Sequence, residues 1–440
     1  MLAGLGLVGL VLSLPALYLV DLPAWVYQGA LFQAEAADAS ATPWSQVAYP
    51  VPNTFATLLP ALLLPLAGPI WTGKLIAIGL LVAGFAAAWA LARAPSPDDA
   101  SSMWARAAVL IACVVVSSSF WNGYLGYQMG VIGAMALGAV WLRRGHLSAP
   151  MVLLGSLVLF FAHAIPFAVV ALAMGVEALR RRDLRQLAAL LPAAALTAWY
   201  GLARLAQPGG GFVDAETPGG GLRWLAYKVY TVLKVGPYHH PDGVDGVGAL
   251  ATLPTLYWLC VIASALFMAA LILGLALGTY RMASSSRRLA TWGAWALAVV
   301  ALALPPFALN VVNPGERILV LAVVALVVLV PLDPRLLRVL GLAALVFLLD
   351  DASSLWAQRD GLSDADRIAF YADRAEREQN PDAYTFEDAV EEADASSTPL
   401  LGHPVRLHSD LYDAVLRRDW TRLSFDSGLL RPPTAPRTSP

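Results

Sequence analysis

The chain has 440 residues, of which 58% are hydrophobic and only 14% are charged, and its mean hydropathy is +0.63. Soluble domains average about 45–50% apolar and about 25% charged residues, so this composition excludes an ordinary soluble fold and predicts an all-α polytopic membrane protein. The net charge of −2 offers no basic surface for nucleic acid, which we exclude as a partner.

Apolar stretches long enough to cross a bilayer recur along the chain, since a bilayer core requires about 20 apolar residues in a helix. They lie at 2–20, 74–93, 107–121, 124–142, 186–205, 253–279, 289–312 and 317–333, with a shorter stretch at 338–350. Residues 2–20 lack a basic leader and a convincing cleavage site, so we interpret them as the first span. The run 150–179 is broken at residues 163–166 and predicts two short spans that meet at a turn.

Five groups of arginines set the predicted orientation, because cytoplasmic loops retain Lys and Arg. The groups are Arg93 and Arg106; Arg143 and Arg144; Arg180, Arg181, Arg182 and Arg185; Arg281, Arg287 and Arg288; Arg335 and Arg338. With all five groups inside, the loop 21–53, which has no Lys or Arg, lies outside. This places the N-terminus in the cytoplasm and the C-terminus outside, and the expected membrane is the bacterial inner membrane.

Residues 54–70 are apolar but contain Pro60, Pro65 and Pro69, and a span here would invert the charge pattern downstream. Prolines remove helix hydrogen bonds, so we expect a juxtamembrane or re-entrant helix on the external face. The total is then about 11 transmembrane helices within 1–350. Residues 351–430 are more polar and predict a small external region with helical patches near 363–378 and 408–418, and 431–440 predict a disordered tail.

Asp21 follows the first predicted span and precedes Pro23, a pattern that favours a helix start with Asp21 as its N-cap. An ionisable residue at the end of a span is also a candidate functional group. Two interpretations stay open. Asp21 is either a structural cap at the interface or a carboxylate that accepts a proton or orients a hydroxyl beneath the external loops.

Further features follow in the same half of the chain. Tyr49-Pro50-Val51-Pro52-Asn53 leads into the proline-rich segment, Lys74 opens the second predicted span, and Phe120-Trp121-Asn122-Gly123-Tyr124 precedes the fourth. Together with Asp21, this order resembles the GT-C superfamily of integral membrane glycosyltransferases that use polyprenyl-phosphate sugars. The resemblance covers about the first 200 residues, and each motif is degenerate when taken alone.

The resemblance implies a mechanism. A lipid-phosphate sugar donor enters from the outer leaflet, the acid after the first span acts on the acceptor hydroxyl, and cationic groups hold the departing phosphate. Asp21 is therefore the catalytic candidate. Many members carry two adjacent acids here, whereas this chain has Asp21 alone, with Glu35 and Asp38 further downstream. This departure weakens the case for a divalent metal, so no metal ligand is assigned and the lipid-phosphate sugar is the only small molecule expected.

Several polar residues fall on the external side of this topology and are candidates for substrate binding. They are Tyr49, Asn53, Asn122, His163, Lys234, His239, His240 and Arg317. Each has a structural alternative: Asn122 as a turn former, His163 as a hydrogen-bonded turn residue, and the loop 206–252 as a solvated loop rather than a flexible lid. Arg317 stands against the positive-inside bias, with Glu316, lipid headgroups or a substrate phosphate as its partner.

No glycine-rich phosphate loop, Gly-x-Ser-x-Gly elbow or His-Glu-x-x-His motif occurs in the chain. The predicted function is transfer of a sugar from a polyprenyl-phosphate carrier to a glycan, lipid or protein acceptor at the external face. Two alternatives stay open. One is a polytopic transporter or flippase, and the other is a non-catalytic partner in the assembly of cell-envelope polysaccharide.

Overall fold

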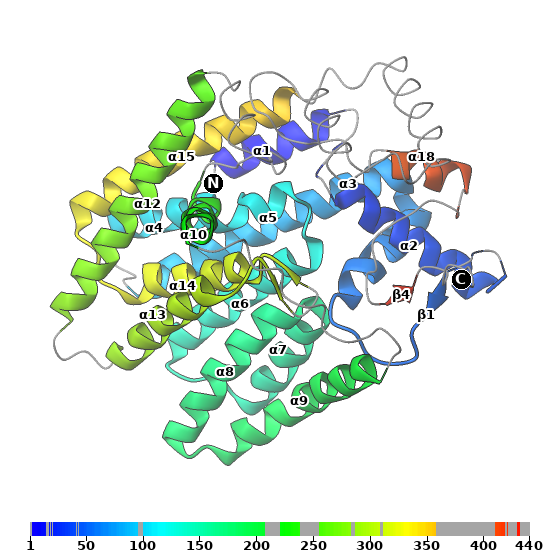
Figure 1. Ribbon diagram of the computed structural model, residues 1–440, viewed down its shortest axis with the longest axis horizontal. Helices are drawn as coiled ribbons and strands as arrows, with labels where there is room; N and C mark the ends of the chain where they lie inside the picture. The colour runs from blue at the N-terminus through cyan, green and yellow to red at the C-terminus, as the bar shows by residue number, and fades with distance from the viewer. Residues whose placement is uncertain are drawn as a thin grey trace.

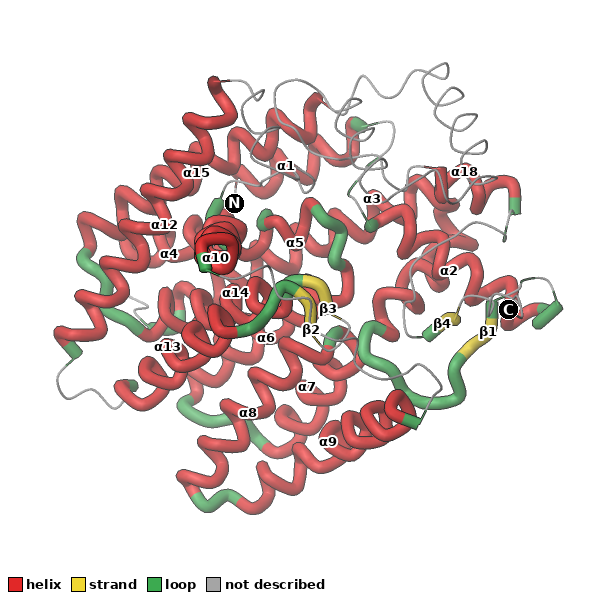
Figure 2. The backbone as a smooth tube through the Cα atoms, viewed as in Figure 1, coloured by secondary structure: helices red, strands yellow, loops and turns green. Residues whose placement is uncertain are grey.

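A computed structural model describes residues 2–14, 17, 19, 21–40, 42, 44–95, 100–206, 221–237, 255–282, 287–308, 311–357, 410–418, 420 and 429–431. This part of the chain is an assembly of packed helices, as the composition predicts (Figure 1). Within it, Figure 2 shows only two short pairs of antiparallel strands. They are β1 (Ser45–Gln46) with β4 (Leu430–Arg431) and β2 (Phe307–Ala308) with β3 (Val311–Val312).

The first two helices are α1 (Leu2–Ser13) and α2 (Leu22–Ala37). The prediction of a span over 2–20 is wrong at its end, because α1 stops at Ser13. The Lys74 ammonium group lies 3.2 Å from the carbonyl oxygen of Leu12 and donates a hydrogen bond to it. A buried lysine thus occupies one of the carbonyls that the end of the helix leaves unpaired.

Helix α3 runs from Thr54 to Arg93 and joins two segments that the sequence predicts as separate. Its 40 residues amount to about 60 Å, twice the thickness of a bilayer core, so it is too long for a single upright span. Gly68, at φ 72° and ψ 171°, breaks the helical geometry just before Pro69. The kink therefore lies close to the predicted boundary between the proline-rich segment and the second span.

A series of helical elements forms the central part of the described chain. They are α4 (Ala100–Leu110), the π-helix η1 (Ile111–Val115), α5 (Ser118–Trp121), α6 (Leu125–Arg144), α7 (Ala149–Ala162), α8 (Ala164–Arg181) and α9 (Leu184–Leu205). The predicted break at His163 is confirmed, since α7 ends and α8 begins on either side of it. The predicted span 107–121 is instead divided between α4, the π-helical turn and the single turn of α5.

The remaining described helices are α10 (Leu222–Lys234), α12 (Thr255–Arg281), α13 (Arg288–Ala303), α14 (Pro314–Leu329), α15 (Pro334–Ala357) and α18 (Asp410–Arg417). The predicted span 289–312 ends early, at Ala303, and the hairpin β2–β3 follows it. Helix α10 lies within the segment predicted as a loop over 206–252. The predicted helix 363–378 and the tail beyond Arg431 lie outside the described residues.

Four helical segments in the described part of the chain are long and apolar enough to cross a membrane. They are Thr54–Arg93, Leu125–Arg144, Leu184–Ala203 and Leu259–Arg281. Shorter apolar helices lie at Gly4–Ser13, Ala100–Val115, Ala149–Ala162 and Arg288–Ala303. The protein is therefore an all-α integral membrane protein.

The C-terminal helix α18 docks onto α2 and α3, where the sequence predicts a helical patch that packs on the membrane domain. The Tyr412 hydroxyl donates a hydrogen bond to the carbonyl of Leu17, at 3.1 Å. A Cβ atom on Gly73 would lie only 2.2 Å from that hydroxyl, so the glycine makes room for the tyrosine. Because β4 also pairs with β1, Leu430 and Arg431 lie against the segment between α2 and α3.

Candidate functional site

Polar side chains from four separate parts of the chain meet at one end of helices α6, α7 and α8. We call them the His163 cluster, which consists of Ser118, Tyr124, Tyr127, His163, Lys234, Glu316 and Arg317. Three of its members were predicted as substrate-binding residues. Helix α14 supplies two charged residues from its first turn, and the break between α7 and α8 supplies the histidine.

Arg317 lies directly against His163, with its Nη1 atom 3.0 Å from the imidazole Nε2. Its guanidinium carbon lies 4.4 Å from the centre of the Tyr124 ring and 5.6 Å from that of Tyr127. The Tyr127 hydroxyl also donates a hydrogen bond of 2.8 Å to the main-chain oxygen of Arg317. Two aromatic rings and a main-chain contact therefore fix the position of this cation.

Around His163, hydrogen-bond donors outnumber hydrogen-bond acceptors. Its Nδ1 atom accepts from the main-chain N–H of Ile165 at 3.1 Å, which leaves the ring proton on Nε2. A guanidinium group can only donate, so Nε2–H and Arg317 present two donors to each other. The Nε atom of Arg317 is also buried, with no hydrogen-bond partner in the described part of the chain. The space between Arg317 and His163 therefore has fewer hydrogen-bond acceptors than donors.

His163 is 5% exposed and lies between α7 and α8, outside the candidate spans. Burial, and then the positive charge of Arg317, hold the pKa of the imidazole well below its ordinary value. The ring is therefore neutral near pH 7, as its contact with the Ile165 N–H requires. A neutral imidazole beside a cation can donate from Nε2 to an anion but cannot neutralise the charge of Arg317.

Lys234 and Glu316 form a buried ion pair beside Arg317. The Lys234 Nζ and Glu316 Oε2 atoms are 3.6 Å apart, and each side chain is 2% exposed. That separation is too long for a good hydrogen bond but short for an ion pair, while Glu316 Oε1 accepts from the Ser118 hydroxyl at 2.6 Å. Glu316 is thus committed to Lys234 and Ser118. The three charged groups together carry one net positive charge.

The main chain of Asp21 is bonded to the loop that precedes α6, at the same end of α6 as the His163 cluster. The Asp21 main-chain N–H donates to the carbonyl of Asn122 at 3.0 Å. Gly123, at φ +66°, permits this approach, because a Cβ there would lie 2.6 Å from the main-chain nitrogen of Leu22. The predicted turn at Asn122 and Gly123 is therefore correct. Tyr124, which stacks on Arg317, comes next in the chain, so Asp21 is tied to the His163 cluster through one short segment.

Asp21 is the N-cap residue of α2, as predicted, but its side chain makes no capping hydrogen bond. The carboxylate is not committed to the helix it precedes. The neighbouring Asn122 is buried, and its Nδ2 atom has no hydrogen-bond partner in the part of the chain that the structure describes. A small, mainly apolar pocket begins here, lined by Leu19, Leu22, Ala77, Leu80, Phe120 and Tyr124 among others.

The other predicted residues divide into three groups. Asn53 is near the site: it has a left-handed backbone at the start of α3, and its Oδ1 atom lies 2.6 Å from where a Cβ of Gly126 would be. Tyr49 instead packs beside Tyr200 of α9, with ring centres 6.3 Å apart. His239 and His240 lie outside the described residues.

Lys234 requires a correction. The sequence suggested a flexible lid over residues 206–252, but Lys234 lies at the end of the helix α10 and is buried against Glu316. The hydrophobic pattern of α10 is the signal that identifies it as a helix.

Sequence reasoning missed three members of the site. Ser118 and Tyr127 have no distinguishing local pattern. Asp351 does, because it follows the predicted span 338–350 just as Asp21 follows the first span. It is 3% exposed and accepts a hydrogen bond of 3.0 Å from the indole Nε1 of Trp121, next to Asn122. The same criterion that selected Asp21 would have selected Asp351.

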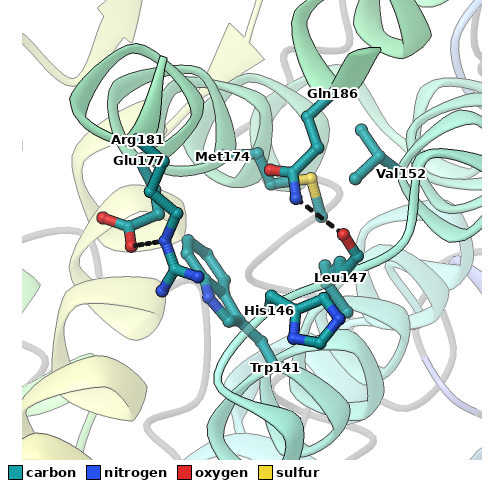
Figure 3. A pocket seen from close by; sticks show the side chains of 8 residues that line it. All are labelled: Trp141, His146, Leu147, Val152, Met174, Glu177, Arg181 and Gln186. Carbon is teal, nitrogen blue, oxygen red and sulfur yellow. Dashed lines mark hydrogen bonds and ion pairs between the residues drawn. The ribbon is translucent and has the colours of Figure 1, made fainter. Parts of the chain in front are cut away.

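A second polar pocket lies at the opposite ends of α6 and α8 (Figure 3). The Glu177 cluster consists of the polar residues that line this pocket, His146, Glu177, Arg181 and Gln186, together with Arg180, which pairs with Glu177. Glu177 pairs with Arg180 and Arg181 at 2.7 and 2.5 Å, and Gln186 donates to the carbonyl of Leu147 at 2.7 Å. Both arginines share one carboxylate, so this cluster also carries one net positive charge, but its arginines are 55% and 38% exposed and are solvated by water.

The geometry gives the His163 cluster a surplus of hydrogen-bond donors and positive charge, near Asp21 and a small apolar pocket. Such an arrangement can bind an anion, with Arg317 and His163 donating to it. Comparison with known proteins adds no identity to this chemistry: the chain matches no family model, no curated protein and no solved structure.

Proposed function

We propose that this protein is a membrane glycosyltransferase of the GT-C type, which moves a sugar from a polyprenyl-phosphate carrier to an acceptor at the external face of the membrane. The proposal includes the finer topology of about 11 spans, an N-terminus in the cytoplasm and a C-terminus outside, in a bacterial inner membrane. The apolar helices support the membrane location. The positions of the arginines in the sequence support the orientation.

The observation that carries the proposal is the shortage of acceptors between Arg317 and His163. The Arg317 Nη1 and His163 Nε2 atoms are 3.0 Å apart, and no carboxylate in the described part of the chain forms an ion pair with Arg317. A phosphate oxygen would accept from both groups and would offset the surplus positive charge. The phosphate of a lipid carrier has this chemistry.

Asp21 supplies the second requirement of the reaction. It lies after α1, its side chain is not used as a cap, and its main chain is bonded to the loop that leads to Tyr124 and Arg317. In the proposed reaction its carboxylate accepts the proton of the acceptor hydroxyl, which attacks the anomeric carbon as the bond to the carrier phosphate breaks.

A flippase is the second candidate, and the buried pair of Lys234 and Glu316 favours it. Ionisable residues enclosed in a membrane protein commonly mark the path of an ion or a substrate. A flippase would move the lipid phosphate between leaflets without breaking the bond to its sugar. The two functions therefore differ in whether the sugar leaves its carrier.

The test uses full-length protein reconstituted in vesicles with a set of radiolabelled polyprenyl-phosphate sugars and candidate acceptors. We expect Asp21→Asn to reduce transfer by about 100-fold or more, the usual contribution of a general base. Asp38→Asn is the matched control, because Asp38 is the C-cap of the same helix, is exposed, and its carboxylate accepts hydrogen bonds from the neighbouring Ser40.

The control variant should retain transfer, and both variants should elute as folded monodisperse protein. Full activity in Asp21→Asn would remove Asp21 from the reaction. The wild type could instead move the intact donor across the bilayer and transfer no sugar to any acceptor. That result would contradict the transferase proposal and support a flippase.

A further inference from the structure

Helix α10 has an apolar face turned away from the protein. Leu222, Leu225 and Val229 are 80%, 59% and 52% exposed. Their spacing of three and four residues places them in one stripe along the helix, and the exposed Ala226 lies within it. A helix on a watery surface would show charged residues on this side.

The side chains of Tyr227, Lys228 and Lys234 lie on the opposite side of α10 and contact the protein. The Tyr227 hydroxyl donates to Asn313 Oδ1 at 2.8 Å, and Lys228 donates to the carbonyl of Leu304. Lys228 also lies 3.7 Å from the centre of the Trp224 ring, and Lys234 pairs with Glu316. Two of the three cations of α10, Lys228 and Lys234, therefore lie against the protein, whereas Arg223 is exposed together with Leu222 and Leu225.

The apolar face of α10 continues a surface that already belongs to a candidate span. Helix α10 packs against α12, on which Leu259, Ile262 and Leu266 are 58%, 52% and 66% exposed. Figure 1 shows α10 nearly end-on, whereas α13 and α14 lie in the plane of the view, so α10 runs across them. If α13 crosses the bilayer, α10 lies roughly parallel to the membrane plane.

We propose that α10 is an interfacial helix whose outward face, formed by Leu222, Leu225 and Val229, lies against the acyl chains of the membrane. Its aromatic residues and Lys228 then lie toward the headgroups and the protein, as in amphipathic helices at the bilayer surface. Because α10 ends at Lys234, it connects the lipid to the edge of the His163 cluster. The proposal concerns lipid contact alone and does not depend on the proposed function.

The experiment measures the surroundings of single nitroxide labels in the full-length protein reconstituted in lipid vesicles. Labels are placed by Leu222→Cys, Leu225→Cys and Val229→Cys in a Cys260→Ala background, in which the fully buried Cys113 is retained and unlabelled parent protein gives the background signal. Leu266→Cys on α12 is the lipid-facing control. Ala39→Cys, in the exposed loop after α2, is the water-facing control.

We expect the three labels on α10 to collide with oxygen more often than with a water-soluble nickel chelate, as Leu266→Cys does and Ala39→Cys does not. The reverse preference would place the face in water and overturn the proposal. Immobile labels that neither reagent reaches would overturn it as well, because they would show that protein covers the face.

Discussion

The two ends of α6 and α8 contain similar residues in opposite environments. The Glu177 cluster holds a histidine, arginines and a glutamate, and the His163 cluster holds a histidine, an arginine, a lysine and a glutamate. In the first, Arg180 and Arg181 are 55% and 38% exposed and share one carboxylate. In the second, Lys234 and Glu316 are each 2% exposed, and the cation of Arg317 faces a neutral ring.

The comparison teaches that burial, and not residue type, marks the candidate site. An exposed ion pair gains little, because water would solvate both charges equally well. Arg317 is partly buried and forms no ion pair in the described part of the chain, so a ligand that supplies negative charge would stabilise it. The two ends of the same helices therefore allow matched tests.

Removing one carboxylate from each end should produce the largest difference. Glu316→Gln leaves the buried Lys234 without its counter-charge, and we expect a loss of about 3 kcal/mol or more in the free energy of unfolding. Glu177→Gln should cost about 1 kcal/mol or less, because its partners are exposed. Thermal and denaturant unfolding of purified protein in detergent compares the two variants.

Equal losses in both variants would contradict the distinction between the ends. A loss in Glu316→Gln that Lys234→Met restores in the double variant would identify the uncompensated lysine as the cause.

A smaller difference is expected for two glycines at opposite ends of α6. A Cβ on Gly126 would lie 2.6 Å from the carbonyl oxygen of Ala162, a main-chain atom that cannot easily move. Gly126→Ala should therefore cost about 2 kcal/mol of stability and disturb the adjacent His163. Gly145 has open space around it but a left-handed backbone at φ +69°, so Gly145→Ala should cost about 1 kcal/mol.

Unfolding midpoints test this pair, and substrate or anion binding adds a second measure. Gly126→Ala should weaken binding at the His163 cluster, whereas Gly145→Ala should leave it unchanged. Equal loss of binding in Gly145→Ala and Gly126→Ala would contradict the assignment of the binding site to the His163 cluster.

The smallest effect concerns pH. Burial lowers the pKa of His163 in the folded protein, so the unfolded chain binds a proton near pH 6.5 that the folded protein does not. Stability should therefore fall as the pH decreases below about 6.5, and His163→Gln should flatten that slope between pH 7 and 5. His146→Gln, which removes an exposed histidine from the Glu177 cluster, should retain the wild-type slope. If the stability of His163→Gln still falls with decreasing pH as that of the wild type does, another group causes the acid sensitivity.

The sequence predicts the helical part of the fold well, because long apolar runs and breaks such as His163 are local signals. It predicts the ends of α1 and α13 poorly. Helix α1 ends at Ser13, two residues before Pro15, a local stop signal that the hydropathy of the run 2–20 hides. The π-helical turn before α5 also carries no pattern that hydropathy could reveal.

The candidate site is predictable only in part. Arg317 and His163 are noticeable alone, as a cation and an imidazole at the ends of apolar runs. Their contact joins residues 154 positions apart, and the contact of Glu316 with Ser118 joins residues 198 positions apart. Lys234 looked like part of a flexible loop because glycine-rich flanks surround a short helix.

The most direct test of the anion site asks whether the protein holds a polyprenyl phosphate through Arg317. Native mass spectrometry of the protein in detergent, with added polyprenyl phosphate, compares Arg317→Gln with Arg181→Gln, which removes an arginine from the opposite end. A charge-assisted hydrogen bond contributes about 1.5–3 kcal/mol, so Arg317→Gln should weaken binding by at least about 10-fold, while Arg181→Gln binds like the wild type. Unchanged binding in Arg317→Gln, or equal loss in both variants, would contradict the account.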